Sequence, residues 1–178
     1  MVIEQMNVRE CHELLARAQI ARLACALDNQ PYIVPIDVEY YDDSFYGFSM
    51  EGQKIDWMRA NPLVCVAVDQ LTTRRQWESV VVFGQYDELT PTVAHVNARR
   101  IAERLFQRHP IWWEPATVPL AGRDSRPPVL FRILVNRMTG RRARLDRDEA
   151  AHVASDASLR RRSRWPAPLF RWRGSRVG

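Results

Sequence analysis

Residues 45–62 read FYGFSMEGQKIDWMRANP, and they carry the clearest structural signals of the chain. It predicts a strand over 45–49, a Gly-containing turn and a short helix over 51–60. The helix is expected to end at Asn61-Pro62, because proline disfavours α geometry in the residue before it. Ser49 ends the strand and Lys54 lies in the first helical turn. The Ser49 hydroxyl, the Lys54 ammonium, the free backbone N–H groups and the positive end of the helix dipole are therefore expected at one place. That is the composition of a phosphate site. The alternative is that Ser49 only caps the helix and Lys54 is solvated.

The composition of the chain sets Lys54 apart. Of the 26 basic residues among 178, 25 are Arg and Lys54 is the only Lys. A basic residue placed here by chance would be Arg, whereas Lys acts as a compact point charge for phosphate. The net charge of +5 is also uneven. Residues 1–136 carry 14 basic and 17 acidic residues, and residues 137–178 carry 12 and 4, so the basicity belongs to the C-terminal segment.

Outward from residues 45–62, the sequence predicts five more strands and two more helices. Asn7 and Glu10 have the spacing of a capping box, and Gly84 marks a bulge in a long strand. Six strands joined mostly by hairpins predict an antiparallel barrel, an all-β core of α+β type with short peripheral helices. The further strands are expected over 19–27, 31–41, 63–69, 77–89 and 129–136, and the further helices over 8–18 and 91–108, the latter opening at Thr90-Pro91.

Several classes of protein are excluded by what the sequence lacks. There is no Gly-x-Ser-x-Gly, His-Glu-x-x-His or Walker motif, and the four histidines lack metal-ligand spacing. Three widely spaced cysteines predict reduced thiols, with Cys25 and Cys65 packed in apolar strands. No apolar run is long enough to span a bilayer, and the N-terminus lacks a signal peptide, so we expect a cytoplasmic protein without membrane contact. We therefore assign no catalytic side chain and no metal.

Five segments, in this order along residues 8–140, resemble one family. The sequence resembles the FMN-binding split-barrel family of pyridoxamine 5′-phosphate oxidase-related proteins, and within it the branch of the nitroimidazole-resistance proteins. The segments that carry this resemblance are IARLA at 20–24, QPYIVPI at 30–36, YGFS to GQK and NP within 46–62, WESVVVFG at 77–84, and FRI with TG within 131–140.

The resemblance implies a six-stranded antiparallel split β-barrel with Greek-key topology, which we place over residues 1–147. The composition predicts an Arg-rich, flexible tail over residues 148–178. The resemblance also implies a homodimer with one FMN in each of two clefts at the subunit interface. The residues that it places at the FMN are Ser49 and Lys54 at the phosphate, with Gln53 and Phe48 next to them in the chain, the main chain of Val34, Pro35, Ile36 and Asp37 along the flavin, Ser79 and Trp77 near its ring, and Trp112 or Trp113 from the partner subunit. Gln53 stands where the oxidases proper carry Arg, which implies a weaker grip on the phosphate.

Function follows from the cofactor, because a flavin carries the redox chemistry while the protein orients it. We expect an FMN-dependent oxidoreductase that takes electrons from a small donor and reduces a small organic acceptor of nitroaromatic or quinone type. The C-terminal Arg/His clamp of the true oxidases is absent, so pyridoxamine phosphate is not the expected substrate. The alternative is a module of the same fold that binds flavin, haem or a deazaflavin without turnover. A third hypothesis, nucleic-acid contact, rests only on the arginines and tryptophans of residues 160–176.

Overall fold

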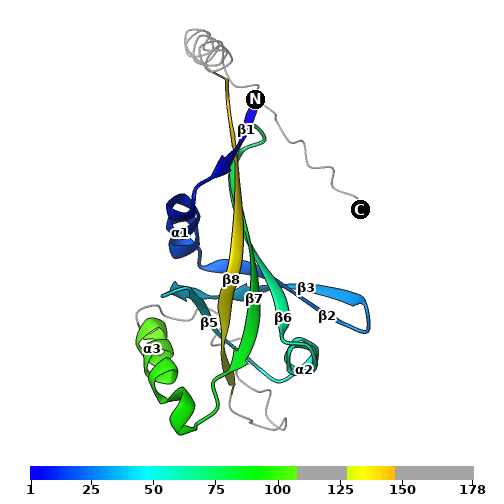
Figure 1. Ribbon diagram of the computed structural model, residues 1–178, viewed down its shortest axis with the longest axis vertical. Coiled ribbons are helices and arrows are strands. Elements are labelled where there is room, and N and C mark those ends of the chain that lie inside the picture. The colour runs from blue at the N-terminus through cyan, green and yellow to red at the C-terminus, as the bar shows by residue number, and fades with distance from the viewer. Residues whose placement is uncertain (108–127, 147–178) are drawn as a thin grey trace, which may run out of the picture.

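The computed structural model describes residues 1–107 and 128–146, which form a sheet with three α-helices around it (Figure 1). The predicted positions Trp112 and Trp113 and the tail over 148–178 lie outside the described residues. The elements are β1 (Val2–Met6), α1 (Val8–Arg17), β2 (Ile20–Leu27), β3 (Gln30–Asp37), β4 (Glu39–Tyr41), β5 (Ser44–Ser49), α2 (Gln53–Ala60), β6 (Leu63–Thr73), β7 (Gln76–Glu88), the 3-10 turn η1 (Val93–His95), α3 (Val96–Phe106) and β8 (Val129–Arg144).

All strands belong to one antiparallel sheet, in the order β3-β2-β6-β7-β8-β5-β4, with β1 also paired to β8. The first and last strands of this order, β3 and β4, are separated in the chain only by Val38. The sheet therefore curls back on itself, and the carbonyl of Asp37 in β3 lies 3.4 Å from where a Cβ on Gly47 of β5 would stand. This is the predicted antiparallel split-barrel fold, with the sheet left open between its end strands β3 and β4.

The described residues form eight strands, where the sequence predicted six. The predicted strand over 31–41 is two strands, because Val38 turns into the core, where it is fully buried. β1 is an addition that pairs with residues 140–144 of β8, a contact between the two ends of the described chain that local sequence does not reveal. β8 accordingly runs to Arg144, beyond its predicted end at Asn136.

The helices mostly follow the prediction. α1 begins with the predicted capping box, in which the Glu10 N–H donates to Asn7 Oδ1 at 3.0 Å and the Asn7 N–H donates to Glu10 Oε2 at 2.8 Å. The predicted helix after Thr90 begins later, with η1 at Val93, because the Thr90 hydroxyl pairs with His95 Nδ1 at 2.9 Å rather than with the first helical N–H groups. No helix among residues 1–107 and 128–146 is long and apolar enough to cross a membrane.

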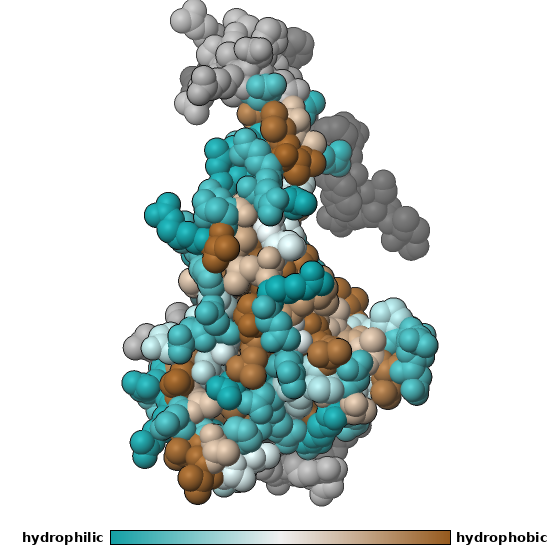
Figure 2. Space-filling model, viewed as in Figure 1, coloured by the Kyte–Doolittle hydropathy of each residue, from teal (hydrophilic) through white to brown (hydrophobic). Residues whose placement is uncertain are grey.

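The core lies inside the curled sheet, and α1 and α2 pack against it through buried side chains such as Leu15 and Ile55. The paired ends of β1, β7 and β8, which we call the arm (residues 2–6, 76–80 and 140–144), extend beyond this core (Figure 1). Figure 2 shows hydrophobic patches interspersed with hydrophilic side chains, both on the arm and over the main body of the molecule.

The register of β7 and β8 shifts between Phe83 and Gly84, which confirms the predicted bulge. A Cβ on Gly84 would stand 2.6 Å from the main-chain oxygen of Leu134 and 2.7 Å from Ile133 Cγ2. We expect Gly84→Ala to lower the free energy of unfolding by about 1–3 kcal/mol, because the backbone of β8 must move. Urea unfolding measures this. The exposed neighbour Gln85 supplies the control Gln85→Ala, and equal stability of the two variants would contradict the packing described.

Candidate functional site

The turn from β5 to α2 presents an uncapped helix N-terminus. Gly52 is the N-cap of α2, with φ 159°, and no side chain caps the helix. The Ser49 hydroxyl donates instead to the carbonyl oxygen of Met50 at 2.8 Å, so the alternative in which Ser49 caps the helix is wrong. The first-turn N–H groups of Gln53 and Lys54 are therefore bound by no capping side chain and remain available to an anion.

Lys54 lies in this first turn with a half-buried side chain. Burial lowers the pKa of its ammonium, and the nearby Cys25 of β2 opposes that shift. Within the part of the chain that the structure describes, no hydrogen bond or ion pair involves this ammonium. A partly desolvated cation without a counter-charge is costly, so the position favours an incoming anion.

The predicted residues Val34, Pro35, Ile36 and Asp37 lie on β3, which contacts α2 through Tyr32. β3 is at the end of the sheet order and is paired only to β2, so one edge of its backbone is not used by the sheet. Tyr32 of β3 packs edge-to-face on Trp57 of α2, with ring centroids 5.5 Å apart. α2 and the edge of β3 are thus neighbours, as a ligand that spans both requires.

Phe48 has a packing role in the structure. Its ring lies edge-to-face on Phe106 of α3 at 5.1 Å between centroids, which fixes α3 against β5.

Trp77 and Ser79 do not join the Lys54 turn within one chain. Ser79 lies on β7 beside Asp69 of β6, and its hydroxyl donates to Asp69 Oδ1 at 2.6 Å. The other carboxylate oxygen of Asp69 accepts from Arg22 of β2 at 3.1 Å. Cys65 of β6 is paired with Ala24 of β2, in the part of that strand next to Lys54, and on its other side with Phe83 of β7. Phe83 is therefore the β7 residue level with this part of β2, and Ser79 lies further away along the strand. The four residues from Ser79 to Phe83 correspond to about 13 Å of strand.

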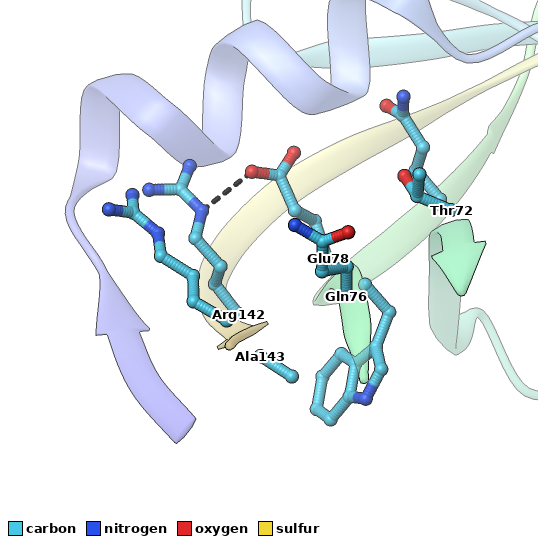
Figure 3. Close-up of a pocket in the computed structure, with 8 residues that line it drawn as sticks. Thr72, Gln76, Glu78, Arg142 and Ala143 are labelled. Carbon is cyan, nitrogen blue, oxygen red and sulfur yellow. Dashed lines mark hydrogen bonds and ion pairs between the residues drawn. The ribbon is translucent and has the colours of Figure 1, made fainter. Parts of the chain in front are cut away.

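Trp77 borders a polar groove of about 410 Å³ on the arm (Figure 3). Trp77 is paired in register with Ala143 of β8, and Glu78 and Arg142 form the wall of the groove. The charges of this wall are paired, because Arg142 Nε donates to Glu78 at 2.6 Å and its NH1 donates to Glu10 at 2.7 Å. The hydrogen bond from the Asn7 N–H, followed by that from Arg142, lowers the pKa of Glu10. The groove thus offers polar surface and one aromatic ring, with its main cation already neutralised.

An ionic cluster that local sequence does not reveal lies beside the Lys54 turn. Arg59, in the last turn of α2, binds both Glu51 of the turn and Glu88 at the end of β7. Glu88 is 29 residues away from Arg59, so only the folded chain reveals this cluster.

Known proteins resemble the chain over most of its length. The pattern of the family described as pyridoxamine 5′-phosphate oxidase matches residues 7–142. An uncharacterised protein of Rhizobium meliloti is 42% identical over 146 residues, which cover 80% of this chain and 97% of that protein.

Two solved structures extend this comparison. The structure of an FAD-binding protein of Mesorhizobium loti is 41% identical with a TM-score of 0.68, covering 82% of this chain and 99% of that one. A Bacteroides thetaiotaomicron structure described as a 5-nitroimidazole antibiotic resistance protein shares the fold at 19% identity and a TM-score of 0.57, covering 79% and 89%.

The unpaired ammonium of Lys54 predicts a stability cost. We expect Lys54→Met to raise the free energy of unfolding at neutral pH by about 0.5–2 kcal/mol, because it removes a half-buried charge. Burial lowers the pKa of Lys54 in the folded state, so the unfolded chain binds more protons and wild-type stability recovers as the pH rises toward the ordinary value of 10.5. The gap between variant and wild type should therefore narrow in urea unfolding at rising pH. A gap of the opposite sign would show that Lys54 has a counter-charge.

Proposed function

This chain belongs to the pyridoxamine 5′-phosphate oxidase family, and we propose that it binds a flavin nucleotide, FMN, with the phosphate at the start of α2. One observation carries this proposal. The half-buried ammonium of Lys54 has no counter-charge among residues 1–107 and 128–146, and it lies at a helix N-terminus that no side chain caps. A phosphate supplies the missing negative charge and accepts from the free N–H groups.

The residues present fit such a ligand. Lys54 and the N–H groups of the first turn would hold the phosphate, with the Gln53 amide and the Ser49 hydroxyl close by in the chain. No atom of residues 1–107 or 128–146 lies within 4 Å of the place where a Cβ on Gly52 would stand, so these residues leave the turn open to a ligand. The edge of β3, from Val34 to Asp37, provides main-chain groups for the isoalloxazine ring.

FAD is a second candidate, favoured by the 41% identical relative described as FAD-binding. FMN and FAD share the phosphate next to the ribityl chain, so the same Lys54 contact serves either. FAD needs further space for a second phosphate and an adenosine. Binding measured for both nucleotides separates them.

We propose further that two copies associate through the outer face of the sheet. Here β2, β3, β6 and β7 place a row of apolar side chains on the side away from the core: Ile33, Ala24, Cys65 and Phe83, in register across the four strands. Ile33, with 61% of its surface exposed, stands at the end of this row. An apolar row of this kind marks an interface. Ser79 and Trp77 lie on the same side of β7, so association places them at the interface between the copies.

A bound flavin supplies redox chemistry, and no side-chain acid or base is required of the chain. We propose an oxidoreductase that passes electrons from a small donor to a nitroaromatic or quinone acceptor. The chain's part is to orient the ring along the edge of β3 and to leave the polar groove beside Trp77 for a small molecule. A module that holds flavin, haem or a deazaflavin without turnover is the alternative.

Lys54→Ala is expected to weaken FMN binding by about 1.5–3 kcal/mol, the value of a charge-assisted contact. Riboflavin, which lacks the phosphate, should bind the variant and the wild type equally. Fluorescence titration measures both affinities. Arg9, an exposed cation of α1 that pairs with Glu13, supplies the control Arg9→Ala. An unchanged FMN affinity in Lys54→Ala would refute the phosphate contact.

Val81→Asp places a charge on the outer face, opposite Ala67, and should convert the dimer into a monomer. Size-exclusion chromatography with light scattering gives the mass, and far-UV circular dichroism verifies that the variant is folded. Val93, which is 91% exposed in η1, supplies the control Val93→Asp. A wild-type protein that is monomeric at all concentrations would contradict the proposed interface.

Turnover is tested by mixing the FMN-loaded protein with NADH or NADPH and then with a nitroaromatic or a quinone under anaerobic conditions. The flavin absorbance is expected to fall when NADH or NADPH is added and to return when the acceptor is added. As a control, dithionite reduces the bound flavin chemically, and its reoxidation by each acceptor is compared with that of free reduced FMN. If neither class of acceptor reoxidises the bound flavin faster than free FMN, the non-catalytic alternative is favoured.

A further inference from the structure

Arg59 joins the Lys54 turn to the sheet through two carboxylates. Its Nε and NH2 donate to Glu88 at 2.7 and 2.9 Å, and its NH1 and NH2 donate to Glu51 at 2.8 and 3.0 Å. Both ion pairs are bidentate, which is the geometry that holds a carboxylate most firmly. Glu88 is itself anchored, since it is paired in register with Phe131 of β8 and accepts from the Tyr86 hydroxyl at 3.0 Å.

Glu51 is a potential competitor for the anion site. It directly precedes Gly52, the N-cap of α2. A carboxylate at this position is attracted by the positive end of the helix dipole and by an ammonium in the first turn. In the structure the Glu51 carboxylate instead lies against Arg59, in the last turn of the helix, so the first turn remains open.

We propose that Arg59 is a positioning residue that holds Glu51 away from the first turn of α2 and neutralises it, so that a nucleotide phosphate can bind there. This inference rests on the proposed function. Arg59, Glu51 and Glu88 have side chains that are 39%, 32% and 27% exposed. Pairs this exposed add little to stability. The cluster therefore affects the negative charge near Lys54 more than it affects the free energy of unfolding.

The hydrogen bond from Arg59 also lowers the pKa of Glu88, so this carboxylate stays ionised and keeps Arg59 in place. Asp56, on the same helix, reaches Arg59 only at 4.0 Å and is itself 69% exposed. Glu51 is thus the carboxylate whose position depends on Arg59 and that stands next to the N-cap.

The test compares FMN with riboflavin in Arg59→Met, which keeps the aliphatic stem and loses the charge. FMN affinity should fall about tenfold, the scale of one charge-assisted contact, while riboflavin affinity stays the same. Glu51→Gln in the Arg59→Met background should restore most of the FMN affinity, because it removes the competing charge. Arg9→Met is the matched control. If Arg59→Met fails to fold, Arg59→Lys, which cannot grip both carboxylates, should show the same FMN-specific loss.

Three results would overturn the inference. Equal losses for FMN and riboflavin, or no rescue by Glu51→Gln, would mean that Arg59 acts through the packing of α2. An unchanged FMN affinity in Arg59→Met would mean that Glu51 does not compete. The proposed function fails separately: a wild type that binds riboflavin as tightly as FMN has no phosphate site, whatever Arg59 does.

Discussion

The half-buried ammonium of Lys54 is the constraint on which the account of this protein depends. Holding a cation out of water with no carboxylate from residues 1–107 or 128–146 beside it costs free energy. The fold does so by packing α2 against β2 and β3 through Ile55, Met58 and the contact of Trp57 with Tyr32. The same packing aims the uncapped end of α2 outward. A stability cost that coincides with an open helix N-terminus is typical of a binding site, where local rules are broken for function.

The other half of the expected site is not completed by a single chain. Trp77 and Ser79 lie on β7, away from the Lys54 turn, and Ser79 is bound to Asp69 and through it to Arg22. These residues occupy the outer side of the sheet, where the apolar row of β2, β3, β6 and β7 also lies. The face through which we propose that two copies associate is therefore also the face that carries the second group of predicted site residues.

Much of the fold was predictable because its signals are local. The capping box at Asn7, the bulge at Gly84 and the turn before α2 depend on residues that are near one another in sequence. What the sequence did not predict depends on distant partners. β1 exists only because β8 is long enough to pair with it, and Glu51, Arg59 and Glu88 form a cluster only when α2 packs beside the end of β7. Lys54 could be singled out by type, since it is the only Lys in the sequence. That residues 1–107 and 128–146 supply no counter-charge for it is a property of the folded chain.

The central claim is that the chain holds a flavin nucleotide by its phosphate. The most direct measurement is the absorbance spectrum of the protein after incubation with FMN, FAD or riboflavin and removal of unbound ligand by gel filtration. The account predicts the bands of oxidised flavin in the protein fraction after FMN or FAD, and much less after riboflavin. Protein that stays colourless with all three ligands, or that retains riboflavin as well as the nucleotides, would contradict it.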